Sequence, residues 1–225
     1  MTDRRLEWLK RGIAAARRSG GVSLLLTAVA VAIYFSPPSV AAALQYDRDR
    51  IVAGEVYRAI TCHWTHWSHD HYVWDAMLFL MLGVALERPI RRQMLAALAL
   101  AAVAIPCGLL LFQPEMRLYR GLSGLDSALF VLLCVDVARE RAREGERQWV
   151  PVCVILLAAL LVKSAIEFTT GATIFVDSRR AGFVPVPLAH LIGGLSGAAV
   201  AAAVTLADLN GRIASPPRMA LSSNR

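Results

Sequence analysis

Long apolar stretches constrain this chain more than any other feature of its sequence. They lie at residues 22–44, 70–87, 93–112, 121–138, 149–168 and 184–207. Most of them approach the roughly 20 residues with which an α-helix crosses a hydrocarbon core about 30 Å thick. Every backbone N–H and C=O group must be paired inside lipid, which a single helix achieves and a single strand does not. The sequence therefore predicts an all-α polytopic membrane protein, a bundle of six transmembrane helices.

The polar connections between these stretches are too short to form a separate soluble domain. We expect a basic cytoplasmic N-terminal segment over residues 1–21, one membrane domain over 22–207 and a short disordered cytoplasmic tail over 208–225. The basic start and the first apolar stretch also resemble a cleaved signal peptide, although the stretch is longer than the usual ~7–15 apolar residues. Pro37-Pro38 predicts that the first helix ends or kinks at that point.

The distribution of Lys and Arg predicts the orientation of the bundle. The two termini and the loops on their side of the membrane hold 16 of the 24 basic residues, and the loops on the opposite side hold 7. Short cytoplasmic loops carry such an excess, so both termini are predicted to be cytoplasmic. The net charge of +7 follows this membrane pattern. We therefore expect the basic residues to face a lipid bilayer and not nucleic acid.

Polar and ionisable side chains lie near the start of three apolar stretches. They are His66, His69, His71 and Asp75 around the second stretch, Ser123 and Asp126 in the fourth, and His190 in the sixth. With cytoplasmic termini, the even-numbered helices all enter from the outer face, which places the three groups at similar depth. Ionisable residues inside a span mark a functional site by default. We expect the groups to share one cavity that opens to the outer face.

The fourth apolar stretch is too short to cross the membrane before the charged run that starts at Arg139. We therefore expect residues 113–120 to dip into the membrane as a loop, which requires a water-filled cavity or a covering of protein. Ser123 then lies at a helix N-terminus, where backbone N–H groups and the helix dipole favour a developing negative charge. An acyl-transfer serine needs this environment.

The sixth stretch carries His190, Gly193 and Gly197 on one helical face. Small residues at this spacing let a neighbouring helix approach closely. If that neighbour is the fourth helix, with Gly121 and Gly124, its serine comes within hydrogen-bonding reach of the histidine. A neutral imidazole can take the proton of a serine hydroxyl near pH 7. The pair therefore predicts a nucleophile and its base.

Two short motifs resemble those of the rhomboid family of intramembrane serine proteases. They are Gly121-Leu122-Ser123-Gly124 and Ala189-His190-Leu191-Ile192-Gly193, the latter followed by Gly197. The resemblance implies a six-helix rhomboid-like core and an endopeptidase that cleaves transmembrane or membrane-adjacent segments through a Ser123–His190 dyad and an acyl-enzyme. It also implies single-span or membrane-anchored protein substrates, no cofactor, no metal and a location in the bacterial inner membrane.

The resemblance continues into the first outer loop and the second stretch. Tyr57-Arg58 matches the family's aromatic–arginine pair, His66 falls on a structural histidine, and His71 falls on a histidine that helps to bind the oxyanion. Asp75 stands where the family usually has asparagine. An asparagine can donate a hydrogen bond to an oxyanion, whereas an ionised aspartate can only accept one. Asp75 therefore serves there only when protonated, or it orients His71 one helical turn away.

Ser127 is a second departure, because many family members have a tyrosine four residues after the nucleophile. Together with Asp126 it makes the predicted site more polar than is usual for the family. This polar site and the compact form resemble rhombosortases, which process sorting tails that carry a Gly-Gly plus helix signal.

Two other functions fit parts of the sequence. The Asp75 departure is compatible with an inactive rhomboid-like protein that only binds membrane clients. The cluster His63, His66, His69 and His71 is compatible with a metal-binding membrane protein, although a second set of ligands is missing. Lys163 and Glu167 are spaced i to i+4 in the fifth stretch, which predicts an internal ion pair and no catalytic role.

Overall fold

The computed structural model describes residues 21–174, 176 and 178–214, and the predicted basic N-terminal segment lies almost wholly outside this range. The described chain forms the helices α2 (Gly21–Tyr34), α3 (Pro38–Leu44), α4 (Arg48–Val52), α5 (Arg58–Thr61), α6 (His69–Glu87), α7 (Arg91–Phe112), α8 (Ser123–Arg143), α9 (Trp149–Thr170), α10 (Ser178–Ala181) and α11 (Pro187–Ala214). A 3-10 turn covers Cys62–Trp64, and two short strands, β1 (Tyr46–Asp47) and β2 (Leu118–Tyr119), pair in antiparallel fashion. The predicted all-α fold is confirmed.

Among the residues that the structure describes, three helices are long and apolar enough to cross a membrane by length and composition, namely α7, α9 and the Pro187–Asp208 part of α11. Helix α2 is apolar but shorter. The apolar stretches of α6 and α8 carry buried carboxylates, Asp75 and Asp126 among them, which lower their hydropathy. The predicted membrane bundle is thus present, while the count of six spans stays a prediction.

The first apolar stretch does not form one continuous helix. Helix α2 ends at Tyr34 and α3 begins at Pro38, so the expected span over 22–44 is divided in two. Pro37 and Pro38 cause the break, because proline lacks an N–H and its ring clashes with the preceding turn of a helix. The prediction that these prolines end the helix is confirmed.

The last helix is longer than hydropathy predicts. Helix α11 continues to Ala214, so residues 208–214 are helical where we expected the start of a disordered tail, and 215–225 lie outside the described range. Asp208 explains part of the difference, because its Oδ2 lies 2.9 Å from Arg139 Nη2 and 3.1 Å from Arg143 Nη2 of α8. These ion pairs fix the end of α11 beyond the apolar stretch.

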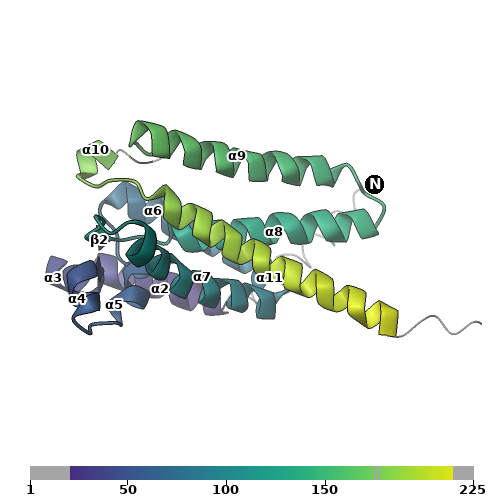
Figure 1. Ribbon diagram of the computed structural model, residues 1–225, viewed down its shortest axis with the longest axis horizontal. Coiled ribbons are helices and arrows are strands. Elements are labelled where there is room, and N and C mark those ends of the chain that lie inside the picture. The colour runs from purple at the N-terminus through teal and green to yellow at the C-terminus, as the bar shows by residue number, and fades with distance from the viewer. Residues whose placement is uncertain (1–20, 175, 177, 215–225) are drawn as a thin grey trace, which may run out of the picture.

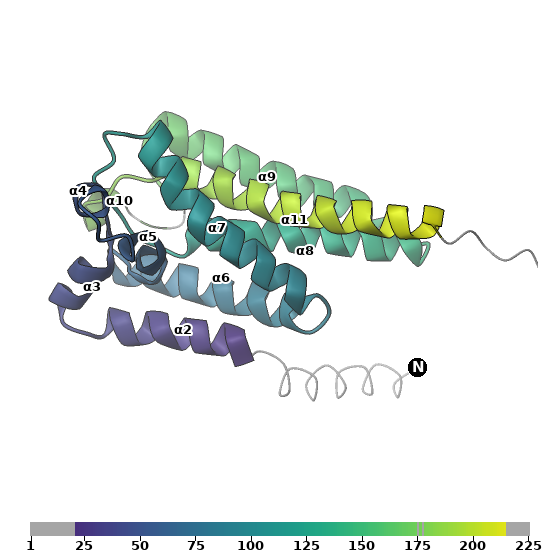
Figure 2. The ribbon, with the colours of Figure 1, turned by 60° about the horizontal axis from the view of Figure 1, so that its bottom comes forward.

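The long helices pack as a bundle, and the loops that carry the short helices gather at one end of it (Figure 1). Helix α11 packs most extensively on α8 and α7, and α9 contacts α8 and α11. Helix α2 packs on α6 at the side of the bundle opposite α9 (Figure 2). The short helices α3, α4, α5 and α10 lie at the loop end, together with β2 (Figures 1 and 2).

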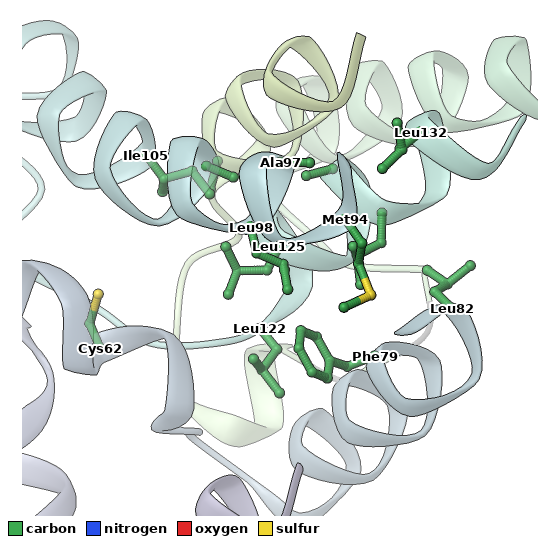
Figure 3. Close-up of a cluster of buried hydrophobic side chains, with 14 of the residues drawn as sticks. Cys62, Phe79, Leu82, Met94, Ala97, Leu98, Ile105, Leu122, Leu125 and Leu132 are labelled. Atoms are coloured by element: carbon green, nitrogen blue, oxygen red, sulfur yellow. The ribbon is translucent and has the colours of Figure 1, made fainter. Parts of the chain in front are cut away.

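Apolar side chains from α6, α7 and α8 fill the space between these three helices (Figure 3). Phe79 of α6, Met94 of α7 and Leu125 of α8 are almost fully buried in this cluster. Leu122, the residue before α8, is also fully buried and faces Phe79 in the same cluster (Figure 3). The start of α8 is thus held by the core.

The loop before α8 is tied to the end of the first apolar stretch. Tyr119 pairs with Tyr46 in the β1–β2 ladder. Arg120 donates from Nε to Gln45 Oε1 at 2.8 Å and from Nη1 to the His66 carbonyl oxygen at 3.1 Å. These contacts fix the backbone immediately before Ser123, where the sequence predicted only an irregular loop.

Candidate active site

Ser123 is the first residue of α8, and the chain turns sharply just before it. Gly121 has φ +130°, a conformation that residues with a side chain rarely adopt. A Cβ at this position would lie 2.8 Å from His71 Nε2. Glycine is therefore required both by the backbone angle and by the approach of the loop to α6.

Glycines let α11 approach α8 to backbone contact. A Cβ at Gly193 would overlap the carbonyl oxygen of Gly124, and one at Gly197 would overlap that of Ala128. The structure thus places the small residues of the sixth apolar stretch against the fourth, in the arrangement that the spacing predicts.

Ser123 and His190 meet at this helix crossing. His190 Nε2 lies 3.1 Å from Ser123 Oγ, within hydrogen-bonding distance. His190 is buried, and Ser127 turns its hydroxyl back to donate to the Ser123 carbonyl oxygen at 2.9 Å. A serine hydroxyl beside an imidazole nitrogen is the arrangement of a nucleophile and a general base.

The other ring nitrogen of His190 faces an acid that the sequence did not connect with it. His190 Nδ1 lies 3.1 Å from Glu167 Oε2 of α9. The second carboxylate oxygen of Glu167 lies 2.7 Å from Lys163 Nζ, which confirms the predicted ion pair. A signal for the contact was present, since an ionisable residue inside a span marks a functional site. In the sequence, the ion pair with Lys163 was enough to explain the charge of Glu167. No feature of the sequence indicated that α9 contacts α11 beside His190.

Asp75 of α6 contacts the backbone at the start of α8. Its Oδ2 accepts hydrogen bonds from the backbone N–H groups of Leu122 at 3.0 Å and Ser123 at 3.2 Å. The same oxygen lies 3.2 Å from His71 Nε2 and 3.4 Å from His66 Nε2. The carboxylate therefore contacts His71, which agrees with the expectation that Asp75 orients this histidine. It also accepts hydrogen bonds from the backbone N–H groups that an oxyanion at Ser123 would need.

The loop between α4 and α6 is built around Arg58, whose side chain is buried. Its Nε donates to Glu55 Oε2 at 2.6 Å, and its Nη1 donates to the Ala42 carbonyl oxygen at 2.9 Å. The hydrogen bond from Arg58 holds the pKa of the Glu55 carboxyl below its usual range. Arg58 thus joins this loop to the end of α3, and within the described part of the chain it makes no hydrogen bond to Ser123.

The four clustered histidines do not share one partner. His63 Nε2 lies 3.1 Å from the carbonyl oxygen of Ala102 on α7, whereas His66 and His71 both face Asp75. The ring of His69 lies beside that of Tyr34, with centroids 5.9 Å apart. Within residues 21–174, 176 and 178–214, no group of three or more His, Cys, Asp or Glu side chains is arranged so that it could hold a metal ion.

A cavity of about 710 Å³ opens beside Ser123 and His190. Its walls are mostly apolar and come from α6, α8, α9, the segment before α11, and α11 itself; Trp74, Phe130, Leu156 and Val184 are among the lining residues. The carboxylates of Asp75, Asp126 and Glu167 also reach the wall. Asp126 is buried, and neither of its carboxylate oxygens has a hydrogen-bond partner within the described part of the chain.

Comparison with known proteins agrees with this architecture. A family model described as a Rhomboid domain matches residues 53–207, which is more than half of the chain. No curated protein matches the sequence. The matched range begins before α5 and includes α6 to α9 and most of α11, so it contains every long helix that lines the cavity. The chain is an integral membrane protein that belongs to the rhomboid family of intramembrane proteases.

Proposed function

We propose that this chain is an intramembrane serine endopeptidase in which Ser123 is the nucleophile and His190 the general base. The observation that carries the proposal is the distance of 3.1 Å between His190 Nε2 and Ser123 Oγ. A serine hydroxyl is a weak nucleophile until an adjacent base removes its proton. The two residues come from different helices, and glycine contacts between α8 and α11 hold them together.

The reaction follows the steps of serine acyl transfer. Ser123 Oγ attacks the scissile carbonyl carbon while its proton passes to His190 Nε2, which gives a tetrahedral oxyanion. The oxyanion collapses, the peptide C–N bond breaks, and His190 returns the proton to the leaving amine. Water then attacks the acyl-enzyme ester, losing its proton to His190, and the released Ser123 takes that proton back.

The cavity supports a membrane-embedded substrate. Its lining is mostly apolar, with side chains such as Phe130 and Leu156, and Ser123 lies at its wall. A transmembrane or membrane-adjacent segment that enters from the lipid and unwinds locally would bury its apolar side chains there and present a carbonyl group to the serine. We therefore propose single-span or membrane-anchored proteins as substrates.

The charge distribution supports a location and an orientation. The excess of Lys and Arg at the termini and in alternate loops favours six spans with both termini cytoplasmic, in the bacterial inner membrane. In this orientation the cavity opens to the outer face, because α6, α8 and α11 all begin at the same end of the bundle (Figure 1).

Asp75 supports a second candidate, an inactive rhomboid that binds membrane clients without cutting them. Its carboxylate accepts hydrogen bonds from the N–H groups of Leu122 and Ser123. When ionised it has no proton with which to donate a hydrogen bond to an oxyanion. For catalysis this oxygen has to leave the Ser123 N–H group so that the substrate oxyanion can take its place. His71 Nε2, which contacts Asp75, is then a further donor to the oxyanion.

Cleavage of a single-span reporter in liposomes distinguishes the two candidates. The wild-type chain is expected to produce two fragments, and Ser123→Ala to produce none. Ser196→Ala is the matched control, because Ser196 is also buried and its hydroxyl donates only to Ile192 of its own helix. Tight reporter binding without cleavage by the wild-type chain would contradict the protease and support the binder.

A pair of reporters tests the rhombosortase subtype. One carries Gly-Gly before its transmembrane helix, and the other is identical except for Ala-Ala at that place. A rhombosortase-like enzyme is expected to cut the first in preference to the second, while equal rates would assign the chain to a broader substrate class.

A further inference from the structure

A buried carboxylate lies behind His190, on the side of the ring opposite Ser123. Glu167 is 2% exposed, and its Oε2 lies 3.1 Å from His190 Nδ1. Their contact is an ion-pair distance that is not aligned as a hydrogen bond, and neither atom has a hydrogen-bond partner within the described part of the chain. Catalytic hydrogen bonds are often poorly aligned in free enzymes and tighten when substrate binds. Two buried polar atoms that have only each other at this distance point to a shared function.

We infer that Glu167 is a positioning residue for His190, so that the site is a Ser123–His190–Glu167 triad in place of a dyad. The inference rests on the proposed serine peptidase function. When His190 Nε2 accepts the Ser123 hydroxyl, the ring proton of the neutral imidazole must be on Nδ1. An acceptor at 3.1 Å from Nδ1 selects this tautomer and fixes the rotation of the ring.

The charge of Glu167 acts at the next step. Once the Ser123 proton has moved to Nε2, His190 is an imidazolium cation, and the carboxylate behind it stabilises that charge. No proton passes to Glu167 at any step. When His190 gives its proton to the leaving amine, the ring returns to the neutral tautomer with the proton still on Nδ1.

Lys163 explains how a carboxylate can be present at this depth. Its ammonium nitrogen lies 2.7 Å from Glu167 Oε1, one helical turn away on α9. A lone charge inside an apolar bundle is expensive, and pairing reduces that expense. Because Lys163 engages only Oε1, the other oxygen remains directed at His190.

The experiment must separate this role from a structural one, because Glu167 also lies where α9 meets α11. Full-length Glu167→Gln in liposomes is expected to lower kcat for reporter cleavage by about 10²-fold or more, since general base catalysis contributes about 10²–10⁴-fold. KM is expected to stay unchanged, because Glu167 acts through His190 on the transition state. Glu167→Asp keeps a carboxylate and is expected to recover part of the loss.

Glu87→Gln is the matched control. Glu87 is a buried carboxylate in α6 that accepts hydrogen bonds from the Val22 N–H at 2.9 Å, the Ser23 N–H at 3.0 Å and the Ser23 hydroxyl at 2.8 Å. It tests the loss of a buried charge in the α2–α6 contact, away from Ser123. Its kcat per folded molecule is expected to equal that of the wild type, with thermal unfolding in detergent giving the folded fraction.

Labelling of Ser123 by a fluorophosphonate separates the failure of this inference from the failure of the proposed function. A wild-type chain that is labelled and a Glu167→Gln variant with wild-type kcat would overturn the triad and leave the Ser123–His190 peptidase intact. A fall in kcat that matches the loss of folded protein would also overturn it. A wild-type chain that neither cuts nor reacts would overturn both proposals. If Glu167→Gln does not fold, the double variant Lys163→Leu/Glu167→Leu, which removes both charges of the ion pair, takes its place, and a wild-type kcat per folded molecule overturns the triad.

Discussion

At the scale of single residues, Asp75 controls the backbone donors beside Ser123. Its Oδ2 lies 3.0 Å from the Leu122 nitrogen and 3.2 Å from the Ser123 nitrogen. An ionised carboxylate repels an oxyanion and occupies the N–H groups that would stabilise it. An asparagine side chain of the same shape can still accept a hydrogen bond from one of these N–H groups, and its NH₂ group can donate a hydrogen bond to the oxyanion.

We therefore predict that Asp75→Asn keeps or raises reporter cleavage and extends it to higher pH, because the amide has no charge to gain. One oxyanion donor contributes about 10²–10³-fold in rate, which sets the upper limit of the gain. Asp75→Leu, with neither donor nor acceptor, is the control and is expected to cut more slowly than Asp75→Asn. Initial rates between pH 6 and 9 provide the measurement; an Asn variant slower than wild type throughout would show that Asp75 has another role.

The contact between Ser123 and His190 could be predicted from sequence, because each is a polar residue in an apolar stretch and the predicted topology places both at one depth. The contacts of Asp75 with the Leu122 and Ser123 N–H groups could not, because they depend on the turn that Gly121 makes at φ +130°. The contact between Glu167 and His190 depends on the packing of α9, which no local pattern of residues determines.

At the scale of elements, the crossing of α8 and α11 sets the distance between nucleophile and base. A Cβ at Gly193 would overlap the Gly124 carbonyl oxygen, so any side chain there forces the helices apart. At Gly194, the next residue, a Cβ would meet Val131 Cγ2 at 3.4 Å and Leu160 Cδ2 at 4.0 Å, which are ordinary van der Waals contacts. The two neighbouring glycines of α11 therefore differ in whether they can be replaced by a residue with a side chain.

We predict that Gly193→Ala lowers cleavage by about 10²-fold, the loss expected when reacting groups are misplaced by about 1 Å. Gly194→Ala is the matched control and is expected to retain wild-type cleavage. Rates are measured on folded protein, as judged by thermal unfolding. Equal activity of the two variants would mean that the helices adjust without separating Ser123 from His190.

The loop between α4 and α6 gives a prediction for stability against pH. Arg58 holds the pKa of Glu55 below its usual range, so the folded protein keeps this carboxylate ionised at a pH where the unfolded chain takes up a proton. The stabilisation is complete above the ordinary pKa of a glutamate and is lost as the pH falls through the lowered value. Thermal unfolding of wild type and Glu55→Gln is expected to differ at pH 7 and to converge on acidification, whereas a constant difference would assign the effect to uncharged contacts.

At the scale of the whole molecule, hydropathy predicted the bundle but not where each helix ends. Pro37-Pro38 divides the first stretch into α2 and α3, and ion pairs with Arg139 and Arg143 of α8 fix α11 beyond its apolar part. Hydropathy reports which residues prefer lipid, whereas helix ends depend on backbone hydrogen bonds and local charge pairs. The predicted orientation follows from the distribution of Lys and Arg between the two sides of the bundle.

Glu115 and Glu144 are both exposed and lie in the loops before and after α8. If α8 crosses the membrane and both termini are cytoplasmic, these positions lie on opposite sides. In intact bacterial cells, a membrane-impermeant maleimide is expected to label Glu115→Cys at once and Glu144→Cys only after permeabilisation. The unsubstituted chain controls for its own cysteines, of which only Cys107 is exposed. Labelling of Glu144→Cys alone in intact cells would show that the chain has the reverse orientation. Equal labelling of both variants from outside would mean that α8 does not cross the membrane.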